Sequence, residues 1–161
     1  LLAEGVPLKD MRTILETLSE GTSFSKDSEK LTALVRIKLG RLIIQEISEP
    51  DHPLEVMTLE PSLEQLLNDL ISNAQSIEDV ALEPNLSQSF FSSVSEIVEE
   101  MEKEEKYPIL VVSPTIRSWL ARLLKRAKQE LSVLSYREIP DDQSIRIVQT
   151  IELNDKESSE E

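Results

Sequence analysis

The chain has 161 residues, which is enough for one domain or for two small units that share a core. It contains no cysteine, which excludes disulfide bonds and thiolate metal sites and fits a reducing compartment. Its formal net charge is −14, and residues 51–108 carry 14 acidic and only 2 basic side chains. Such a surface repels phosphate and anionic lipid, so we expect no nucleic-acid partner and favour a basic protein instead.

The sequence shows no signal for membrane insertion or export. No segment reaches the roughly 18 to 20 consecutive apolar residues of a membrane-spanning helix, and residues 1–10 contain no basic region followed by an apolar run. We therefore expect the chain itself to be soluble. It begins with Leu1 and has no initiator methionine, which predicts a piece of a longer protein, and we expect this piece to be a monomer.

Two helices are predicted in the first 52 residues. The first covers residues 7–20, with Pro7 in its first turn and Gly21 as its C-terminal cap. The second is a single helix over residues 27–47, with Asp27 as its N-cap and apolar residues on two faces. Two such faces need two partners, either within the chain or in a second subunit. The first helix has an apolar stripe that we expect to be buried, formed by Met11, Ile14, Leu15 and Leu18.

The pattern changes after the turn-forming residues 48–53. Alternating apolar residues are typical of a half-buried strand, and an uninterrupted apolar run is typical of a strand covered on both faces. A strand, a helix and a second strand in succession should be parallel and right-handed. The predicted elements are a strand over 54–59, helices over 61–72 and 84–106, a strand over 109–112, a helix from Pro114, and strands over 132–136 and 144–151.

These elements predict a mixed fold of the α+β or α/β class. A helical subdomain over residues 1–52 is followed by a small α/β subdomain over residues 53–153, whose sheet is mixed and has roughly four strands. Residues 154–161 form an acidic tail that has too few apolar side chains to pack, and we expect this tail to be disordered.

The sequence offers little for catalysis. The one histidine, His52, has no second histidine or cysteine to complete a triad or a metal site, and three glycines do not form a phosphate-binding loop. Ser113 follows the predicted strand 109–112, where α/β enzymes often place a nucleophile. Because no Gly-x-Ser-x-Gly turn surrounds it, a helix cap is favoured over a hydrolase or transferase. We expect no cofactor, no metal and no small-molecule substrate.

Two helices carry opposite charges. Residues 96–105 include six glutamates, which we interpret as a solvated helix face because no apolar pocket separates their pKa values. The helix from Pro114 is basic on the face away from its leucines, and this face could bind an acidic partner or the protein's own acidic helix. We call it the basic face, and it consists of Arg117, Arg122, Lys125, Arg126 and Lys128.

Six segments carry a family resemblance. Residues 1–16 read LLAEGVPLKDMRTILE, followed by LTALVR at 31–36, LGR at 39–41, LVVSPTIR at 110–117, VLSYREIP at 133–140 and IRIV at 145–148. In this order and spacing they resemble the cytoplasmic part of the FlhA family, the type III export gate proteins of flagella and injectisomes. The resemblance covers nearly all of residues 1–153, and the segment YREIP favours the flagellar branch over the injectisome branch.

This resemblance implies a large inner-membrane protein whose soluble carboxy-terminal half forms a nine-membered ring beneath the export channel. The chain would be a non-enzymatic scaffold at the cytoplasmic face of that membrane, where it would dock export substrates, their chaperones and components of the export ATPase. It would reach the membrane only through a missing amino-terminal half. The main chaperone pocket of the family would lie upstream of Leu1.

The resemblance also implies a set of ring contacts. The helical subdomain makes these contacts in the family, so charged residues on the first two predicted helices are candidates. The alternative for each of them is a salt bridge within the chain on an exposed helix face. The interface candidates are Arg12, Glu16, Arg36, Lys38 and Arg41.

Overall fold

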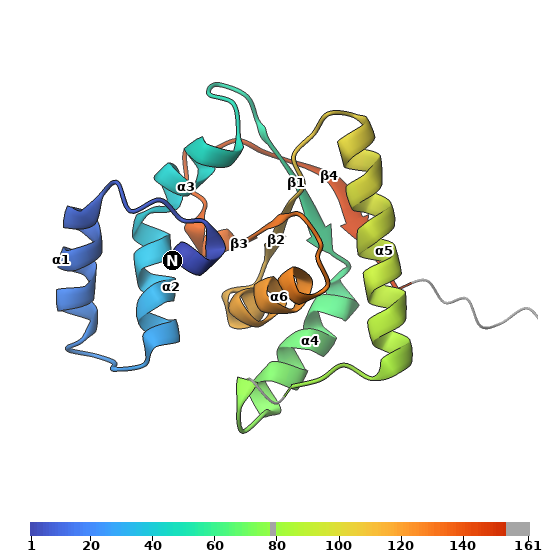
Figure 1. The fold of residues 1–161 in the computed structure, drawn as a ribbon, viewed down its shortest axis with the longest axis horizontal. Helices are drawn as coiled ribbons and strands as arrows, with labels where there is room; N and C mark the ends of the chain where they lie inside the picture. Colours follow the sequence, from blue (N-terminus) through green and yellow to red (C-terminus); the bar gives the residue numbers. More distant parts are fainter. Residues whose placement is uncertain (78–79, 154–161) are drawn as a thin grey trace, which may run out of the picture. The chain divides into compact units, whose positions relative to one another are not determined.

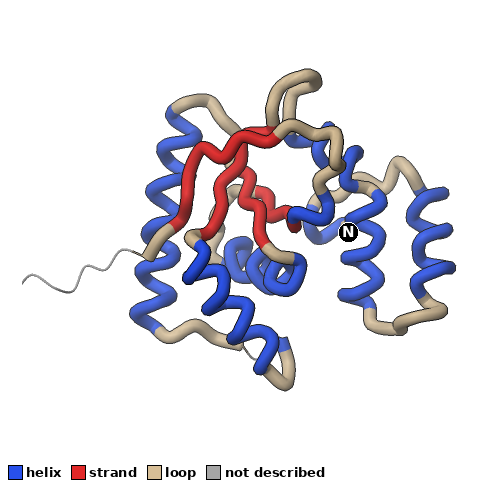
Figure 2. Tube along the Cα trace, turned by 180° about the vertical axis from the view of Figure 1, so that it is seen from behind, coloured by secondary structure: helices blue, strands red, loops and turns tan. Residues whose placement is uncertain are grey.

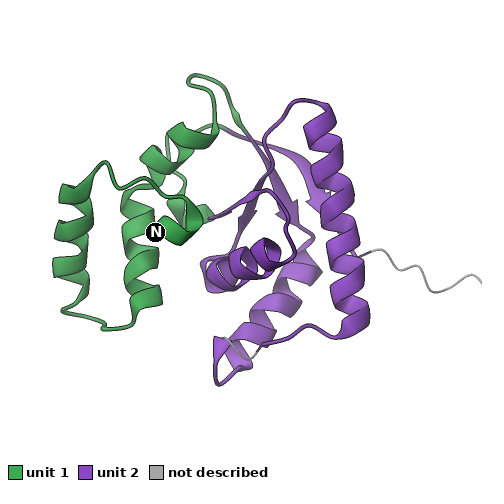
Figure 3. Cartoon of the chain, viewed as in Figure 1, with its two compact units in different colours: residues 1–54, 135–144 green, residues 55–134, 145–161 purple. Residues whose placement is uncertain are grey.

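The computed structural model describes residues 1–77 and 80–153, so the predicted disorder of residues 154–161 lies outside the described part (Figure 1). The chain forms two compact units (Figure 3). The first comprises residues 1–54 and 135–144, and the second comprises residues 55–134 and 145–161. The predicted subdomain boundary between residues 52 and 53 stays a prediction, and it did not include the return of the chain at residue 135.

The first unit is built from short helices. Its first α-helix begins at Met11 rather than near Pro7, because the side chain of Asp10 accepts a hydrogen bond from the backbone N–H of Thr13 at 3.1 Å and so caps the helix there. Gly21 is the last helical residue rather than the cap. The elements of the first unit are the 3₁₀ turn η1 (Leu2–Glu4), α1 (Met11–Gly21), α2 (Ser28–Lys38), α3 (Gly40–Ile47) and the 3₁₀ turn η3 (Tyr136–Glu138).

The predicted single helix over residues 27–47 is two helices, which meet at Leu39. Asp27 does cap the first of them, as predicted, by accepting the backbone N–H of Glu29 at 2.9 Å. At the junction, a Cβ atom on Gly40 would lie 1.9 Å from the backbone oxygen of Glu138. Only glycine allows this close approach, so the break lies where the returning segment contacts the helix pair.

The apolar stripe predicted for α1 is only partly buried. Ile14 is 4% exposed, whereas Met11 and Leu15 are 47% and 59% exposed. The prediction that Met11 and Leu15 are buried was therefore wrong. Together with Arg12 and Glu16, they give α1 an exposed surface that is both apolar and charged.

Within the described residues, four strands form one sheet in the order β3-β2-β1-β4 (Figure 2). β1 and β2 pair in parallel, and β4 runs along β1 in the same direction, because Leu54 donates to Ser144 and Glu60 donates to Ile151. The sheet is parallel throughout, which corrects the predicted mixed sheet. The long connections explain the difference, since parallel strands require crossovers rather than hairpins. The strands are β1 (Leu54–Leu59), β2 (Ile109–Val112), β3 (Ser132–Ser135) and β4 (Ile145–Ile151).

In the described part of the second unit, three α-helices pack with this sheet, and each begins with proline at its first position, as predicted. They are α4 (Pro61–Asn73), α5 (Pro84–Lys103) and α6 (Pro114–Arg126). Their inward side chains and those of the strands form one apolar core around Leu110, Leu120 and Trp119. None of the described helices has the length and hydropathy required to cross a membrane. The predicted α/β class with about four strands is confirmed.

Candidate interaction surfaces

Arg36 on α2 lies in a buried ion-pair network inside the first unit. Its Nε and Nη2 donate to the carboxylate of Glu138 at 2.8 and 3.0 Å, and its Nη1 donates to Oε2 of Glu4 at 2.9 Å. The side chains of Arg36 and Glu138 are 4% and 2% exposed. Burial alone would lower the pKa of Arg36, but the hydrogen bonds and charges of the two carboxylates outweigh it and raise the pKa. The guanidinium is therefore a fixed cation that joins α2 to η1 and η3.

This position bears on the proposed ring role of Arg36. From the sequence, Arg36 could form either a ring contact or a salt bridge within the chain. In the structure, its ion pairs with Glu4 and Glu138 are salt bridges within the chain. Its role in a ring stays a prediction. The sequence contained no signal for its partner, because Glu138 is 102 positions away and follows an unrelated strand.

The other charged candidates on α1 and α2 are accessible. Nε of Arg12 pairs with Oε1 of Glu16 at 2.9 Å, one helical turn apart, and these side chains are 88% and 61% exposed. Lys38, the last residue of α2, is also exposed. Arg12 and Glu16 alternate along α1 with the exposed Met11 and Leu15. These four residues, which we call the α1 surface, combine apolar area with charge in the manner of a protein interface.

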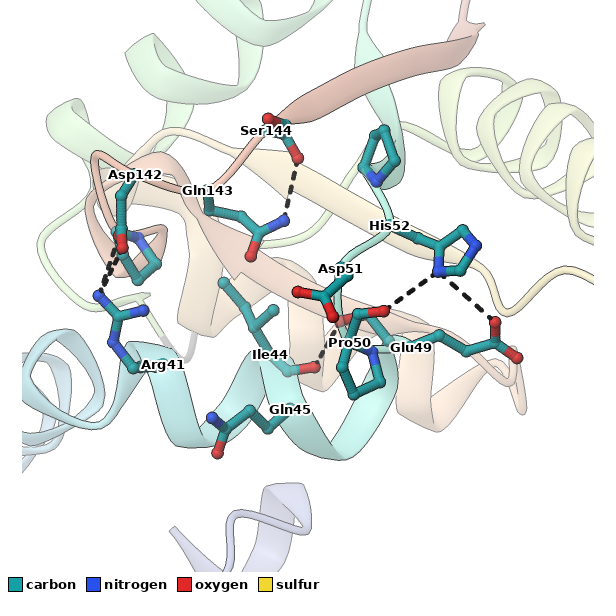
Figure 4. Close-up of a pocket in the computed structure, with 13 residues that line it drawn as sticks. Arg41, Ile44, Gln45, Glu49, Pro50, Asp51, His52, Asp142, Gln143 and Ser144 are labelled. Carbon is teal, nitrogen blue, oxygen red and sulfur yellow. Dashed lines mark hydrogen bonds and ion pairs between the residues drawn. The ribbon is translucent and has the colours of Figure 1, made fainter.

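Arg41 on α3 lines a hollow of about 570 Å³ in the first unit. Figure 4 shows its Nη2 bound to both oxygens of Asp142, at 2.9 and 3.0 Å, on one side of the hollow, with His52 on the other. Nδ1 of His52 lies 3.1 Å from the backbone oxygen of Pro50 and 3.9 Å from Oε2 of Glu49. No described residues group three or more histidine, aspartate or glutamate side chains to hold a metal ion. The lining mixes polar and charged side chains with Ile44 and three prolines.

Ser113 has the contacts of a structural residue. Its hydroxyl donates to the side-chain oxygen of Asn68 at 2.7 Å, and its backbone N–H donates to Oε1 of Glu64 at 2.8 Å. Ser113 occupies the N-cap position of α6, as predicted. Its side chain does not form the hydrogen bond that would cap the helix, so this part of the prediction was wrong. Glu64 accepts its hydrogen bond from the backbone N–H of Ser113 and not from the hydroxyl. A serine hydroxyl that donates to the side-chain oxygen of an asparagine is not activated for nucleophilic attack. The two bonds tie α4 to the start of α6.

The basic face of α6 is divided by burial. Arg117 is only 5% exposed, and Arg122 is half-buried. Lys125 and Arg126 are exposed in the last turn of the helix, and Lys128 is exposed two residues after its end. Cations near the carboxy-terminus of a helix are favoured by the helix dipole, so these three side chains could stabilise α6. The same three side chains would also be the ones available to bind an acidic partner.

The comparisons with known proteins identify the family. Residues 1–144 match the model described as the FHIPEP family. This chain is a member of the FHIPEP family. Its FHIPEP relatives include the flagellar biosynthesis protein FlhA of Salmonella typhimurium, 38% identical over 151 residues, and FlhA of Buchnera aphidicola from Acyrthosiphon pisum, 40% identical over 152 residues. These alignments cover 94% of the chain and 21% of each relative, so the chain spans about a fifth of their length. The resemblance inferred from the sequence is confirmed.

Solved structures share the fold of this FHIPEP member. Shigella flexneri MxiA has a TM-score of 0.77 at 24% identity, covering 94% of this chain and 48% of MxiA. Chlamydia pneumoniae CdsV has a TM-score of 0.76 at 26% identity, covering 92% of this chain and 43% of CdsV. The nonameric EscV cytosolic domain from the type III secretion system has a TM-score of 0.77 at 23% identity, covering 93% of this chain and 44% of that one.

Proposed function

We propose that this chain is a carboxy-terminal cytoplasmic part of a flagellar type III export gate, and that it acts as a ring-forming docking scaffold rather than as an enzyme. The observation that carries the proposal is the alignment of 94% of the chain with FlhA proteins at 38–40% identity. The nonameric assembly of EscV, whose fold is similar, supports a ring. The contacts of Ser113 support the absence of catalysis, because its hydroxyl donates to Asn68.

The location and partners follow from the same proposal. The chain would lie at the cytoplasmic face of the bacterial inner membrane and would be anchored by an amino-terminal half of the full protein. Its partners would be subunits of its own kind, export substrates with their chaperones, and components of the export ATPase. A CdsV structure in complex with CdsO, 28% identical to this chain with a TM-score of 0.74, supports partner binding by this fold.

Two surfaces are proposed for these contacts. The ring would use the α1 surface with Arg12 and Glu16, and also Lys38 and Arg41, all of which are exposed. Arg36 would support this interface from inside by holding α2 in place. The exposed end of the basic face, from Lys125 onward, would seat an acidic partner.

The first test concerns the identity of the whole protein. An antibody raised against this chain should detect, in fractionated cells of the source bacterium, a polypeptide several times larger than 18.3 kDa in the inner-membrane fraction. A band near 18.3 kDa in the soluble fraction would overturn the export-gate proposal and favour a free adaptor or a small hydrolase or transferase.

The second test separates a ring contact from an intrachain pair at Arg41. In the full-length protein, Arg41→Asp should reduce swimming motility. The double variant Arg41→Asp/Asp142→Arg rebuilds the intrachain pair with reversed charges, so it should not restore motility if Arg41 contacts a neighbour. Recovery in the double variant would contradict the interface assignment. Lys103→Glu, at an exposed lysine of the second unit, is the matched charge-reversal control.

A further inference from the structure

β4 lies at the edge of the sheet. One side of it pairs with β1, and no other described strand pairs with its second side. With seven residues, it is the longest of the described strands. An edge strand leaves a row of backbone N–H and C=O groups without strand partners, which another extended chain can pair with.

The side chains of β4 do little to protect this edge. Ile145 is 47% exposed and Ile147 is 61% exposed, and both are β-branched residues that favour strand pairing. β4 contains neither proline nor lysine, the residues that commonly block edge pairing. Its one cation, Arg146, is 64% exposed and pairs within the sheet, with Nη1 at 3.5 Å from Oε1 of Glu55 on the neighbouring strand β1. Among the described residues, this edge is therefore long, apolar in part and without a strand partner.

The surroundings of β4 are acidic. Figures 1 and 2 show α5 beside β4, and Nε2 of Gln149 donates to Oε2 of Glu100 on that helix at 3.4 Å. Glu96 and Glu99 are also exposed on α5, and Glu152 is exposed directly after the strand. An added segment that carries positive charge would therefore meet a complementary surface.

Lys106, which lies next to Glu55 on β1, does not offset this charge. Nζ of Lys106 lies 2.8 Å from Oε2 of Glu104 and 3.4 Å from Oε2 of Glu55, and these carboxylates raise its pKa despite an opposing contribution from desolvation. It is thus bound to acidic partners of its own unit. The later half of β4, towards Glu100 and Glu152, has the surplus of negative charge.

We propose that β4 is a docking strand for an extended, positively charged segment of an unfolded export substrate, which adds to the sheet as a fifth strand. The backbone of the segment pairs with the free edge of β4. Its apolar side chains at alternate positions contact Ile145 and Ile147, and its lysines or arginines pair with Glu100 and Glu152. The proposal rests on the proposed function only for the source of the segment.

A second copy of the chain fits this edge less well. Two β4 strands pairing edge to edge would bring two sets of acidic side chains together, on chains that each carry a net charge of −14. Like charges in close contact disfavour such an interface. A cationic segment gains from the same side chains, which is why it is the proposed occupant.

The test uses the 161-residue chain labelled with ¹⁵N and a blocked ten-residue peptide of alternating valine and lysine. The peptide should shift the amide resonances of residues 145–151 and bind more weakly as NaCl is raised, because salt screens exposed charges. A peptide of alternating valine and glutamate should not bind. Shifts elsewhere in the chain with none in β4, or equal binding of both peptides, would overturn the proposal.

Paired variants test the side chains. Ile145→Ala/Ile147→Ala should weaken binding about five- to tenfold, as expected for the loss of two cross-strand contacts. Leu66→Ala/Leu70→Ala on α4 removes two leucines of comparable exposure, 42% and 38%, away from the edge, and should leave binding unchanged. Equal effects of the two double variants would contradict the proposal. The peptide series on the unaltered chain remains decisive if the β4 variant does not fold.

Backbone pairing has its own signature. In an extended peptide, successive N–H groups point to opposite sides, so N-methylation of the odd residues and of the even residues blocks different edges. One methylated peptide should lose binding and the other should keep it, whereas equal affinities would overturn strand addition. Dimers of the unliganded chain with β4 at their interface would instead identify a second copy as the occupant. None of these outcomes affects the motility and fractionation tests, so failure here is distinguishable from failure of the proposed function.

Discussion

Arg36 and Glu138 are 102 positions apart in the sequence and form a two-point ion pair, with Nε–Oε1 at 2.8 Å and Nη2–Oε2 at 3.0 Å. Parallel bonds of this kind fix orientation as well as distance. Both side chains are almost fully buried, so neither charge can be compensated by water if the other is removed. The pair therefore holds the returning segment 135–144 against α2.

Removing one partner of this pair should be costly. Glu138→Leu should lower the free energy of unfolding by about 3–5 kcal/mol, because it removes a carboxylate that accepts two hydrogen bonds from the buried Arg36 cation. The double variant Arg36→Met/Glu138→Leu should recover much of that loss. Urea unfolding measures both, and strictly additive losses would contradict the pairing. Arg12→Met/Glu16→Leu, at an exposed pair, should change stability by less than about 1 kcal/mol.

Gly40 and Gly5 should respond differently to alanine. A Cβ at Gly40 would meet the backbone oxygen of Glu138 at 1.9 Å, so Gly40→Ala should destabilise the chain by at least about 3 kcal/mol. Gly5 has φ +71 and open space around it, so Gly5→Ala should cost only the backbone strain of about 1–2 kcal/mol. Thermal unfolding of the two variants gives the comparison. Equal losses would indicate that the contact at Gly40 relaxes freely.

The cap of α4 should give a defined pH dependence. Oε2 of Glu60 accepts a hydrogen bond from the hydroxyl of Ser62 and from the backbone N–H groups of Ser62 and Leu63, and these bonds lower the pKa of Glu60 below its ordinary value of 4.5. An acid with a lowered folded-state pKa stabilises the fold above the unfolded-state pKa, and this contribution is lost as the pH falls through the folded-state value. The stability difference between the unaltered chain and Glu60→Gln should therefore be full at pH 7 and shrink below pH 4.5. Urea unfolding across this range would detect it, and a constant difference would contradict the cap.

Ser113 should affect stability and not activity. Ser113→Ala removes the bond to Asn68 and should cost about 1 kcal/mol, because one buried neutral hydrogen bond is lost. Glu64→Ala leaves the Ser113 N–H without its acceptor and should cost about 1–3 kcal/mol. Secretion by the full-length protein should persist in Ser113→Ala. Loss of secretion in a stably folded Ser113→Ala variant would favour the hydrolase or transferase hypothesis instead.

The local signals in the sequence predicted most of the elements. Proline at the first helical position marked α4, α5 and α6, and apolar patterns marked the four strands within one or two residues. These signals act over a single turn or strand, so neighbouring residues suffice to determine them. Pro7 misled for the same reason, because the polar side chain of Asp10 caps α1 more effectively three residues later.

The contacts that depend on distant residues could not be predicted. The helix breaks at Leu39 because the backbone of Glu138 approaches Gly40. The spacing of apolar residues along the sequence gives no sign of such a contact. Burial of Arg36 and exposure of Leu15 reverse what their residue types suggest, since tertiary partners decide both. At the candidate surfaces, Arg12 and Glu16 are four residues apart on one helix, a spacing visible in the sequence. Asp142, the partner of Arg41, lies 101 positions away and required the structure.

Residues 135–144 belong to the first unit, so this unit cannot be completed until they have been synthesised. Ribosomes add roughly 5–20 residues per second, so the 102 positions between Arg36 and Glu138 correspond to about 5–20 s of translation. Throughout this interval the nascent first unit has Glu4 but lacks Glu138, the carboxylate that accepts two hydrogen bonds from Arg36, and it also lacks the backbone that packs on Gly40. The amino-terminal helices are thus made first but completed only after most of the second unit has been made. A nascent chain arrested before residue 138 should expose α2 to proteases that the finished protein resists.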